Sequence, residues 1–236
     1  MIISAALCPA APLLVRDLTG AEEVAADLRE ACLASVAELT AAAPDIIAVV
    51  GAASSTGIWN GAAALDLARY APGQQRRADG PPGVSKGLPS ALGIGAWLLA
   101  RAGSTAGQLL QAVGADEPAA TCAAVGAELA GSHERIALLV MADGSARRGP
   151  KAPGYADERS SGFDAEVEKA VREGRLDALL SVDPVLAREL MAAGRPAWQV
   201  LAGAMEGREV TSEIRYSGDP FGVAYLVASL RAYEGS

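Results

Sequence analysis

Residues 135–142, RIALLVMA, carry the strongest strand pattern in the chain and stop at Asp143-Gly144. A run of apolar residues without alternation is typical of a strand buried on both faces, and such strands occur in parallel sheets. Residues 45–51, DIIAVVG, repeat this pattern and are closed by a glycine. Together the two runs predict a parallel sheet that is covered by helices on both faces.

The segments around these two runs complete an α/β pattern. Residues 1–7 predict a strand, and residues 21–43 carry apolar side chains at helical spacing. Strand, helix and strand in this order predict a βαβ unit with a parallel pair. The final segments, 208–216 and 223–233, predict antiparallel strands around a turn at 217–220.

Further helices are predicted at residues 88–101, 118–130, 163–174, 183–193 and 196–204. Asp164 and Asp183 are suited to cap two of them at the N-terminus. Residues 52–90 predict loop or a short edge strand, in which 72–89 is either a lid or an exposed connection. Without an internal repeat or linker, we expect one α/β domain over residues 1–236. Its central sheet is mixed but mostly parallel, with helices on both faces.

Composition excludes several classes of function. Acidic residues exceed basic ones by 28 − 20 = 8, which argues against nucleic acid as a partner. No apolar run reaches the roughly 18–20 residues that a membrane span needs, and the apolar start lacks the basic leader of a secretory signal. Three scattered cysteines, Cys8, Cys32 and Cys122, suit a reducing compartment. We therefore expect a soluble cytoplasmic protein, with a homodimer plausible from base rates alone.

The chain contains a single histidine, His133. A site that needs two histidines, or one of the common His/Cys zinc sets, cannot be built within one chain. His133 precedes the strand at 135–142 and so lies at the end of the sheet opposite Asp143. A surface turn explains it better than catalysis. Cys8 ends the first strand and is expected to be a small buried apolar residue rather than a nucleophile.

The loops that follow the strands are the candidate binding elements, because ligands of open α/β sheets lie beyond the carboxyl ends of the strands. Residues 143–151, DGSARRGPK, place an acid, a hydroxyl and three cations close together. Arg147, Arg148 and Lys151 suit a carboxylate or phosphate, and a solvated charged loop is the alternative. Ser54 and Ser55 follow the second strand and suit either an anion or a turn cap.

The chain as a whole resembles the B-subunit-like branch of the class III extradiol ring-cleavage dioxygenases, the superfamily that includes the Memo proteins. The resemblance runs from end to end in one order. Residues 8–15 read CPAAPLLV, where family members commonly read CPHPPLLV. The other segments that resemble the family are residues 45–51, ADGSARR at 142–148, KAPGY at 151–155, residues 183–203 and YSGDPFGVAY at 216–225.

This resemblance implies a single α/β domain with a crevice at the strand ends. Active members hold Fe(II) with two histidines and one carboxylate, and use another histidine as acid/base to split catechol-type rings with O₂. The first metal histidine falls at Ala10, and the second falls in the 51–56 loop, which has none. The acid/base histidine falls at Ala146, and the carboxylate falls somewhere within 213–219. We therefore expect neither bound iron nor another cofactor.

The sequence leaves four hypotheses about function. The first is a non-catalytic homologue that binds a small, anionic molecule in the old crevice. Its ligand-binding candidates are Ala10, Ser54, Ser55, Asp143, Ser145, Ala146, Arg147, Arg148, Lys151, Tyr155 and Asp219. The second is a metal-free hydrolase or isomerase that uses Asp143, Ser145 and Lys151. The third is residual dioxygenase activity, and the fourth is a purely structural subunit, which predicts a large exposed apolar patch.

Overall fold

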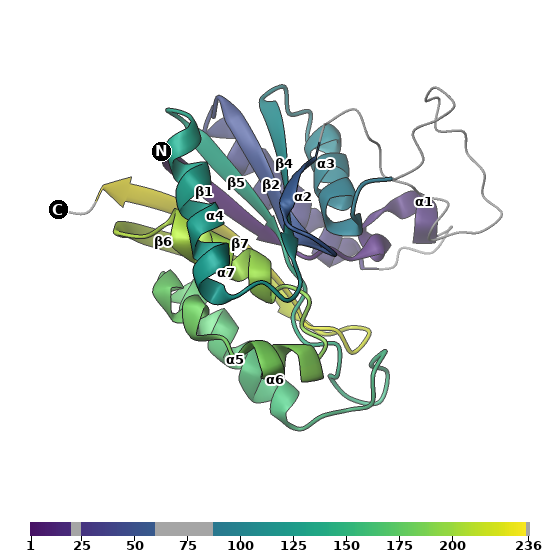
Figure 1. Cartoon of the computed structure of the whole chain (residues 1–236). Coiled ribbons are helices and arrows are strands. Elements are labelled where there is room, and N and C mark those ends of the chain that lie inside the picture. Colours follow the sequence, from purple (N-terminus) through teal and green to yellow (C-terminus); the bar gives the residue numbers. More distant parts are fainter. Residues whose placement is uncertain (20–24, 60–86, 235–236) are drawn as a thin grey trace.

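A computed structural model describes residues 1–19, 25–59 and 87–234 (Figure 1). Its strands form one seven-stranded sheet in the order β3-β4-β2-β5-β1-β7-β6. The strand bounds are β1 Ile2–Cys8, β2 Ile46–Ala53, β3 Gly57–Trp59, β4 Gly107–Gly114, β5 Ile136–Met141, β6 Arg208–Gly218 and β7 Tyr225–Glu234. The four strands β4, β2, β5 and β1 are parallel, whereas β3 and the β7–β6 hairpin run antiparallel to their neighbours. The predicted mixed α/β sheet is confirmed.

The most apolar strand lies in the middle of the sheet. Every residue of β5 is buried, and β5 pairs with β1 on one side and β2 on the other. The prediction that β1 and β2 form a parallel pair is therefore wrong in detail: both are parallel, but β5 lies between them. A strand without polar side chains needs neighbours on both edges and helices on both faces, and the central position provides them.

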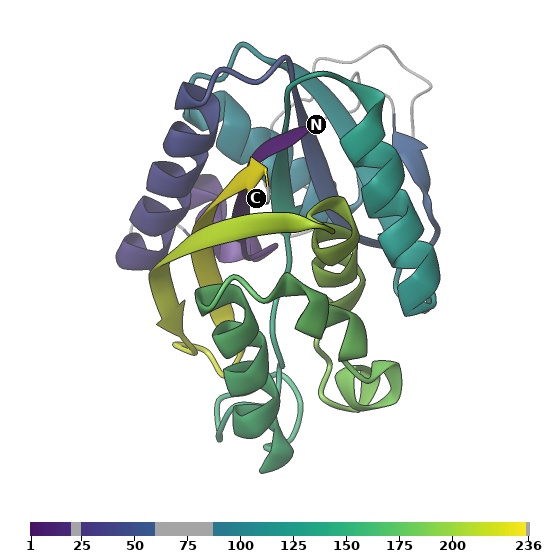
Figure 2. The ribbon, with the colours of Figure 1, turned by 90° about the vertical axis from the view of Figure 1, so that its left-hand side faces the viewer.

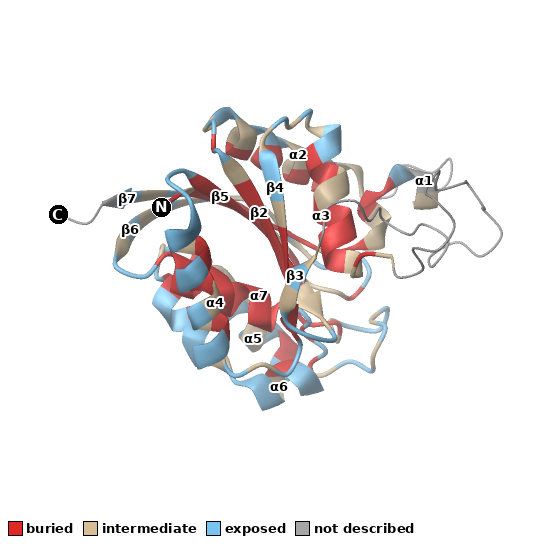
Figure 3. Ribbon diagram, turned by 45° about the horizontal axis from the view of Figure 1, so that its top comes forward, coloured by how far each residue is buried: buried red, intermediate tan, exposed pale blue. Residues whose placement is uncertain are grey.

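Helices cover both faces of the sheet, as Figure 2 shows for α2 (purple) and α4 (teal) on opposite sides. On one face, apolar side chains of α2 (Ala26–Ala41) and α3 (Ser90–Arg101) pack against the sheet. The other face is covered by α4 (Ala119–Ser132), α5 (Arg159–Arg172), the 3₁₀ helix η3 (Leu176–Ser181) and α7 (Arg195–Ala204). Buried residues follow the sheet and the inner sides of these helices (Figure 3). The short helices η1 (Pro12–Leu14), α1 (Arg16–Thr19) and α6 (Pro184–Glu189) complete the described chain.

Helices α4 and α7 pack very closely through two glycines. A Cβ atom at Gly126 would lie 2.2 Å from the carbonyl oxygen of Val200, and one at Gly203 would lie 2.2 Å from that of Ala123. Distances this short do not occur in real structures, so both positions need glycine. Close packing of these two helices fixes α7 against the sheet.

Several boundaries differ from the predictions. Strand β4 was not predicted, because its two glutamines interrupt the apolar pattern, although Gln111 is buried and donates to the carbonyl oxygen of Ala112. The helix predicted at 163–174 begins earlier, at Arg159, so Asp164 is not its cap. Asp183 does cap α6, accepting from the backbone N–H groups of Val185 and Leu186. The predicted 72–89 loop lies outside the described residues except for its last three.

The predicted C-terminal hairpin is confirmed. Strands β6 and β7 pair antiparallel over their whole length, with one register shift between Ile214 and Tyr216.

None of the helices in the described ranges is long and apolar enough to cross a membrane.

Candidate functional site

The carboxyl ends of the parallel strands bring two of the predicted loops together. Cys8 at the end of β1 lies beside Met141 at the end of β5, and the N–H of Ala142 donates to the carbonyl oxygen of Cys8 at 2.8 Å. The chain then places Ala10 beside Asp143, whose Oδ1 accepts the Ala10 N–H at 2.9 Å. Position 10 therefore provides a methyl group and a backbone donor that binds a carboxylate.

Asp143 is a carboxyl group in an apolar environment. Burial raises its pKa to about 6, against a smaller lowering by the Ala10 N–H. The pKa of Tyr225 is also raised, first by burial and then by the negative charge of Asp143. Asp143 also acts on the pKa of Cys32 in α2, which is raised mainly by burial. The side chain of Asp143 therefore belongs to the α2 side of the sheet.

Ser145 belongs to the opposite side. It is fully buried and donates to Asp164 in α5 twice, from its N–H to Oδ1 at 2.9 Å and from its Oγ to Oδ2 at 2.5 Å. Burial raises the pKa of Asp164, although the Ser145 bonds and Arg148 act against it. Ser145 thus bonds Asp164 rather than Asp143, and Lys151 is exposed on the loop. The predicted catalytic set Asp143, Ser145 and Lys151 does not form one hydrogen-bonded cluster.

A pocket of about 250 Å³ opens between α5, α7, the 143–151 loop and the start of β7, and we name it the α5 pocket. The members that give it chemical character are Arg148, Asp164, Glu168, Trp198, Ser217 and Tyr225. Apolar side chains of Val167 and Leu226 complete its wall. The pocket joins an aromatic and aliphatic wall to a charged edge, which is a common form of small-molecule site.

The charged edge of the α5 pocket is organised by hydrogen bonds. Arg148 donates from Nε to Oδ2 of Asp219 at 2.7 Å, and its Nη1 lies 3.7 Å from Oδ2 of Asp164. Ser217 Oγ donates to Oε2 of Glu168 at 2.6 Å. The pKa of Glu168 is lowered first by this bond, against the opposing effect of burial, and then by Arg172 of α5. The edge therefore carries two carboxylates, Asp164 and Glu168, and one guanidinium, and both Glu168 and Arg148 have ion-pair partners, Arg172 and Asp219.

Trp198 lines the α5 pocket and has one unsatisfied donor. The residue is 2% exposed, and its Nε1 has no hydrogen-bond partner within the described chain. Its ring packs near Phe163, with 6.3 Å between the ring centroids. A buried donor without a partner costs free energy.

The other predicted site residues do not converge. Arg147 packs against Gly154, and its Nε is buried without a hydrogen-bond partner in the described chain. Lys151 and Tyr155 are exposed, Tyr155 at 89%, and neither lines the α5 pocket. The three cations of the 143–151 loop thus point to different surroundings.

The remaining predicted positions do not line the α5 pocket. Ala146 is 9% exposed, and Asp219 contributes to the site by pairing with Arg148 and by raising the pKa of Asp164 through its charge. Ser54 and Ser55 are exposed in the turn between β2 and β3. His133 is exposed at the end of α4, where its carbonyl oxygen accepts from the N-terminal ammonium group of Met1.

The sequence reasoning missed Glu168 and Trp198 as site residues and assigned Asp164 to a cap. All three lie on helices, whereas the prediction considered only loops after strands. Glu168 and Asp164 are four positions apart and therefore share one face of α5, a spacing that is visible in the sequence. No group of three His, Cys, Asp or Glu side chains suited to a metal ion occurs among the described residues.

Comparison with known proteins gives a fold and no family. No family model matches the chain, and no curated protein matches it. Among solved structures, it is similar to the uncharacterized protein JW3007 from Escherichia coli K12, with a TM-score of 0.53 and 15% sequence identity. The match covers 97% of this chain and 99% of that one. The chain therefore shares a full-length α/β fold with the E. coli protein.

Proposed function

We propose that this chain is a small-molecule-binding protein built on a scaffold similar to that of the class III extradiol dioxygenases, without their iron-dependent activity. The observation that carries the proposal is the α5 pocket, where Asp164, Arg148 and Glu168 are held in fixed positions in front of Trp198. Preorganised polar groups beside an apolar wall favour binding, because little side-chain entropy is lost when a ligand arrives.

The loss of iron chemistry is supported by the residues at the family's histidine positions. The methyl groups of Ala10 and Ala146 donate no electron pair to a metal, and the N–H of Ala10 instead holds Asp143. The single histidine of the whole chain, His133, is at the far end of the sheet. Residual dioxygenase activity is therefore disfavoured on the chemistry of the available donors.

The ligand we propose is cationic or neutral, in contrast to the anion that the sequence favours. The anion was inferred from Arg147, Arg148 and Lys151, but only Arg148 lines the α5 pocket, and it is paired with Asp219. Together with their ion-pair partners Arg172 and Asp219, the groups at the edge of the pocket are two guanidinium groups and three carboxylates, a net charge of 2 − 3 = −1. A small aromatic amine fits this arrangement, with its ring against Trp198 and its ammonium group near Glu168.

The proposal is tested by comparing tyramine with 3-(4-hydroxyphenyl)propanoate, which have the same ring and opposite charges. Calorimetric titration is expected to detect tyramine binding and weaker or no binding of the anion. In the variant Glu168→Gln, the tyramine affinity should fall about fivefold, the value of one partly exposed charged contact. Glu166→Gln is the matched control, because Glu166 is exposed on the same helix. Tighter binding of the anion, or equal affinities in both variants, would overturn the proposal.

A second candidate function is metal-free acid–base chemistry at Asp143. A carboxyl group with a pKa of about 6 at the carboxyl edge of the sheet is suited to accept and return a proton near neutral pH. A panel of keto acids in D₂O, followed by NMR, would detect proton exchange next to the carbonyl group. Exchange that is lost in Asp143→Asn supports this function, and exchange that persists in the variant contradicts it.

A further inference from the structure

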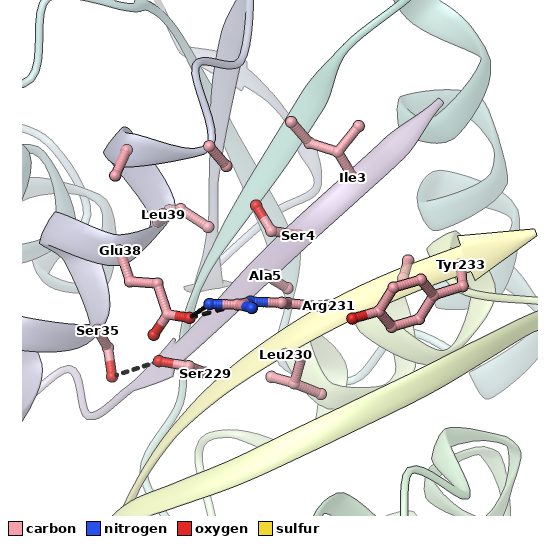
Figure 4. A pocket seen from close by; sticks show the side chains of 13 residues that line it. Ile3, Ser4, Ala5, Ser35, Glu38, Leu39, Ser229, Leu230, Arg231 and Tyr233 are labelled. Atoms are coloured by element: carbon pink, nitrogen blue, oxygen red, sulfur yellow. Dashed lines mark hydrogen bonds and ion pairs between the residues drawn. The ribbon is translucent and has the colours of Figure 1, made fainter.

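A second cavity lies at the other end of the sheet, between α2 and the strands β1 and β7 (Figure 4). It has a volume of about 310 Å³ and involves the beginning of β1, the end of β7 and the C-terminal half of α2. We name it the α2 cavity. Its characteristic residues are Ser4, Glu38, Leu39, Ser229, Arg231 and Tyr233. Because β1 enters the sheet here and leaves it at Cys8, this cavity is at the amino edge of the parallel strands, far from Asp143.

The charges that line the α2 cavity balance one another. Glu38 of α2 accepts from Nε and Nη2 of Arg231, at 3.1 and 2.5 Å, and from Nη2 of Arg215 at 2.5 Å. A smaller hollow of about 200 Å³ shares Glu38, Ser229 and Arg231 with the cavity and extends it over β6. An anion in the cavity would lie beside Glu38, and a cation would lie beside Arg231. A molecule without net charge avoids both repulsions.

The serine hydroxyl groups of the α2 cavity form hydrogen bonds, except that of Ser4. Ser229 Oγ donates to Ser35 Oγ at 3.2 Å and accepts from Nε of Arg215 at 2.8 Å. Ser4 is only 7% exposed, and its Oγ has no hydrogen-bond partner in the described chain. In Figure 4 the Ser4 hydroxyl points from β1 toward α2, into the space that the cavity occupies. A buried hydroxyl without a partner is an available hydrogen-bonding group at the floor of a cavity.

The remaining wall is apolar and open on one side. Ile3, Ala5, Leu39 and Leu230 contribute aliphatic surface to the cavity. Tyr233 is 49% exposed at its rim, and Figure 4 shows its phenol oxygen directed toward Arg231. A ligand can therefore place an apolar body against the aliphatic wall and a polar end between Ser4 and the Arg231 side chain.

We propose that the α2 cavity is a second binding site, for an uncharged small molecule with a carboxamide or hydroxyl end and a branched apolar body. The carboxamide is the best match, because its carbonyl oxygen accepts from Arg231 while its NH₂ group donates to Ser4 Oγ. This inference does not depend on the proposed function of the α5 pocket, since no residue lines both cavities.

The test uses 4-methylpentanamide and two charged analogues of the same shape, 4-methylpentanoate and 4-methylpentylamine. ¹H–¹⁵N NMR spectra of the full chain are recorded with millimolar amounts of each. The amide is expected to shift the backbone signals of Ser4, Glu38 and Arg231, and to bind more tightly than either charged analogue. Shifts that are absent, or confined to other parts of the chain, would overturn the proposal, as would equal affinity for the three molecules.

Two substitutions distinguish specific binding of the amide in the α2 cavity from unspecific binding. Ser4→Ala should weaken the amide about fivefold, and Arg231→Met about tenfold, which correspond to one neutral and one charge-assisted hydrogen bond. Arg101→Met is the matched control, because Arg101 is an exposed arginine of α3 outside the cavity. Ser217→Ala, which alters only the α5 pocket, should leave amide binding unchanged. If Ser4→Ala and Arg231→Met bind the amide as tightly as the natural chain does, the proposal fails even though the cavity exists.

Discussion

Replacing Asp143 with Asn should stabilise the protein at neutral pH. The pKa of Asp143 is raised from 3.8 to about 6 in the folded chain, because burial disfavours the charged form. The difference of about 2 units, at 1.36 kcal/mol per unit, corresponds to about 3 kcal/mol. An asparagine at this position cannot ionise, and its Oδ1 can still accept the N–H of Ala10, which now donates to Asp143 at 2.9 Å.

The sign follows from the direction of the shift. Since the folded pKa is above the unfolded one, the protonated Asp143 favours the folded state. This contribution is fully present below about pH 4 and is lost as the pH rises to about 6, so the ionised carboxylate destabilises the fold at neutral pH. Asp143→Asn removes this loss. The free energy of unfolding of the variant should therefore be close to that of the natural chain near pH 4 and exceed it by about 3 kcal/mol above pH 7.

Urea denaturation of both proteins at several pH values measures this difference directly. Asp116→Asn is a suitable control, because Asp116 is exposed and forms its ion pair with the exposed Arg188. That variant should show no gain that grows with pH. The reasoning is refuted if Asp143→Asn is less stable than the natural chain at neutral pH, or if their difference is the same at every pH.

Three further changes probe the packing and the buried polar groups by the same denaturation assay. Gly126→Ala should destabilise the protein by about 2 kcal/mol or more through the clash with α7, whereas Gly131→Ala in the same helix meets nothing and should stabilise it by about 0.5 kcal/mol. Arg195→Met should cost about 3 kcal/mol, because this buried guanidinium donates to two backbone carbonyls and one amide oxygen, while Arg188→Met on the surface should cost less than about 1 kcal/mol. Ser4→Ala should leave stability unchanged or raise it by about 1 kcal/mol in the absence of ligand, since it removes an unpaired buried hydroxyl, and a large loss would mean that Ser4 already has a partner.

The sequence predicts the strands and most helices well where the apolar pattern is strong. The segments that became β1, β2 and β5 and the C-terminal hairpin are visible in the sequence because their residues are buried on one or both faces. The order of the strands is not visible. That β5 lies between β1 and β2 depends on how three crossovers pack around one another, which no local pattern encodes. Strand β4 escaped prediction because a buried glutamine resembles a surface residue in the sequence.

The candidate site was predictable only in its position. The rule that ligands lie beyond the carboxyl ends of parallel strands correctly brings Ala10 and Asp143 together. It says nothing about the direction of each side chain, so Ser145 was grouped with Asp143 although it bonds Asp164 on the other side of the sheet. Glu168 reaches the site because α5 packs against the β6–β7 hairpin. This contact joins segments that are distant in the sequence, so no local pattern predicts it.

An anaerobic Fe(II) titration of the purified chain, followed by O₂ uptake with catechol and protocatechuate, tests the proposed absence of iron-dependent activity most directly. With alanine at positions 10 and 146 and one histidine in the whole chain, we predict no tight iron binding and no oxygen consumption above the background. One tightly bound iron per chain together with ring cleavage would contradict the account. It would mean that the alignment of Ala10 and Ala146 with the histidines is wrong, or that carboxylates have replaced the histidines as ligands.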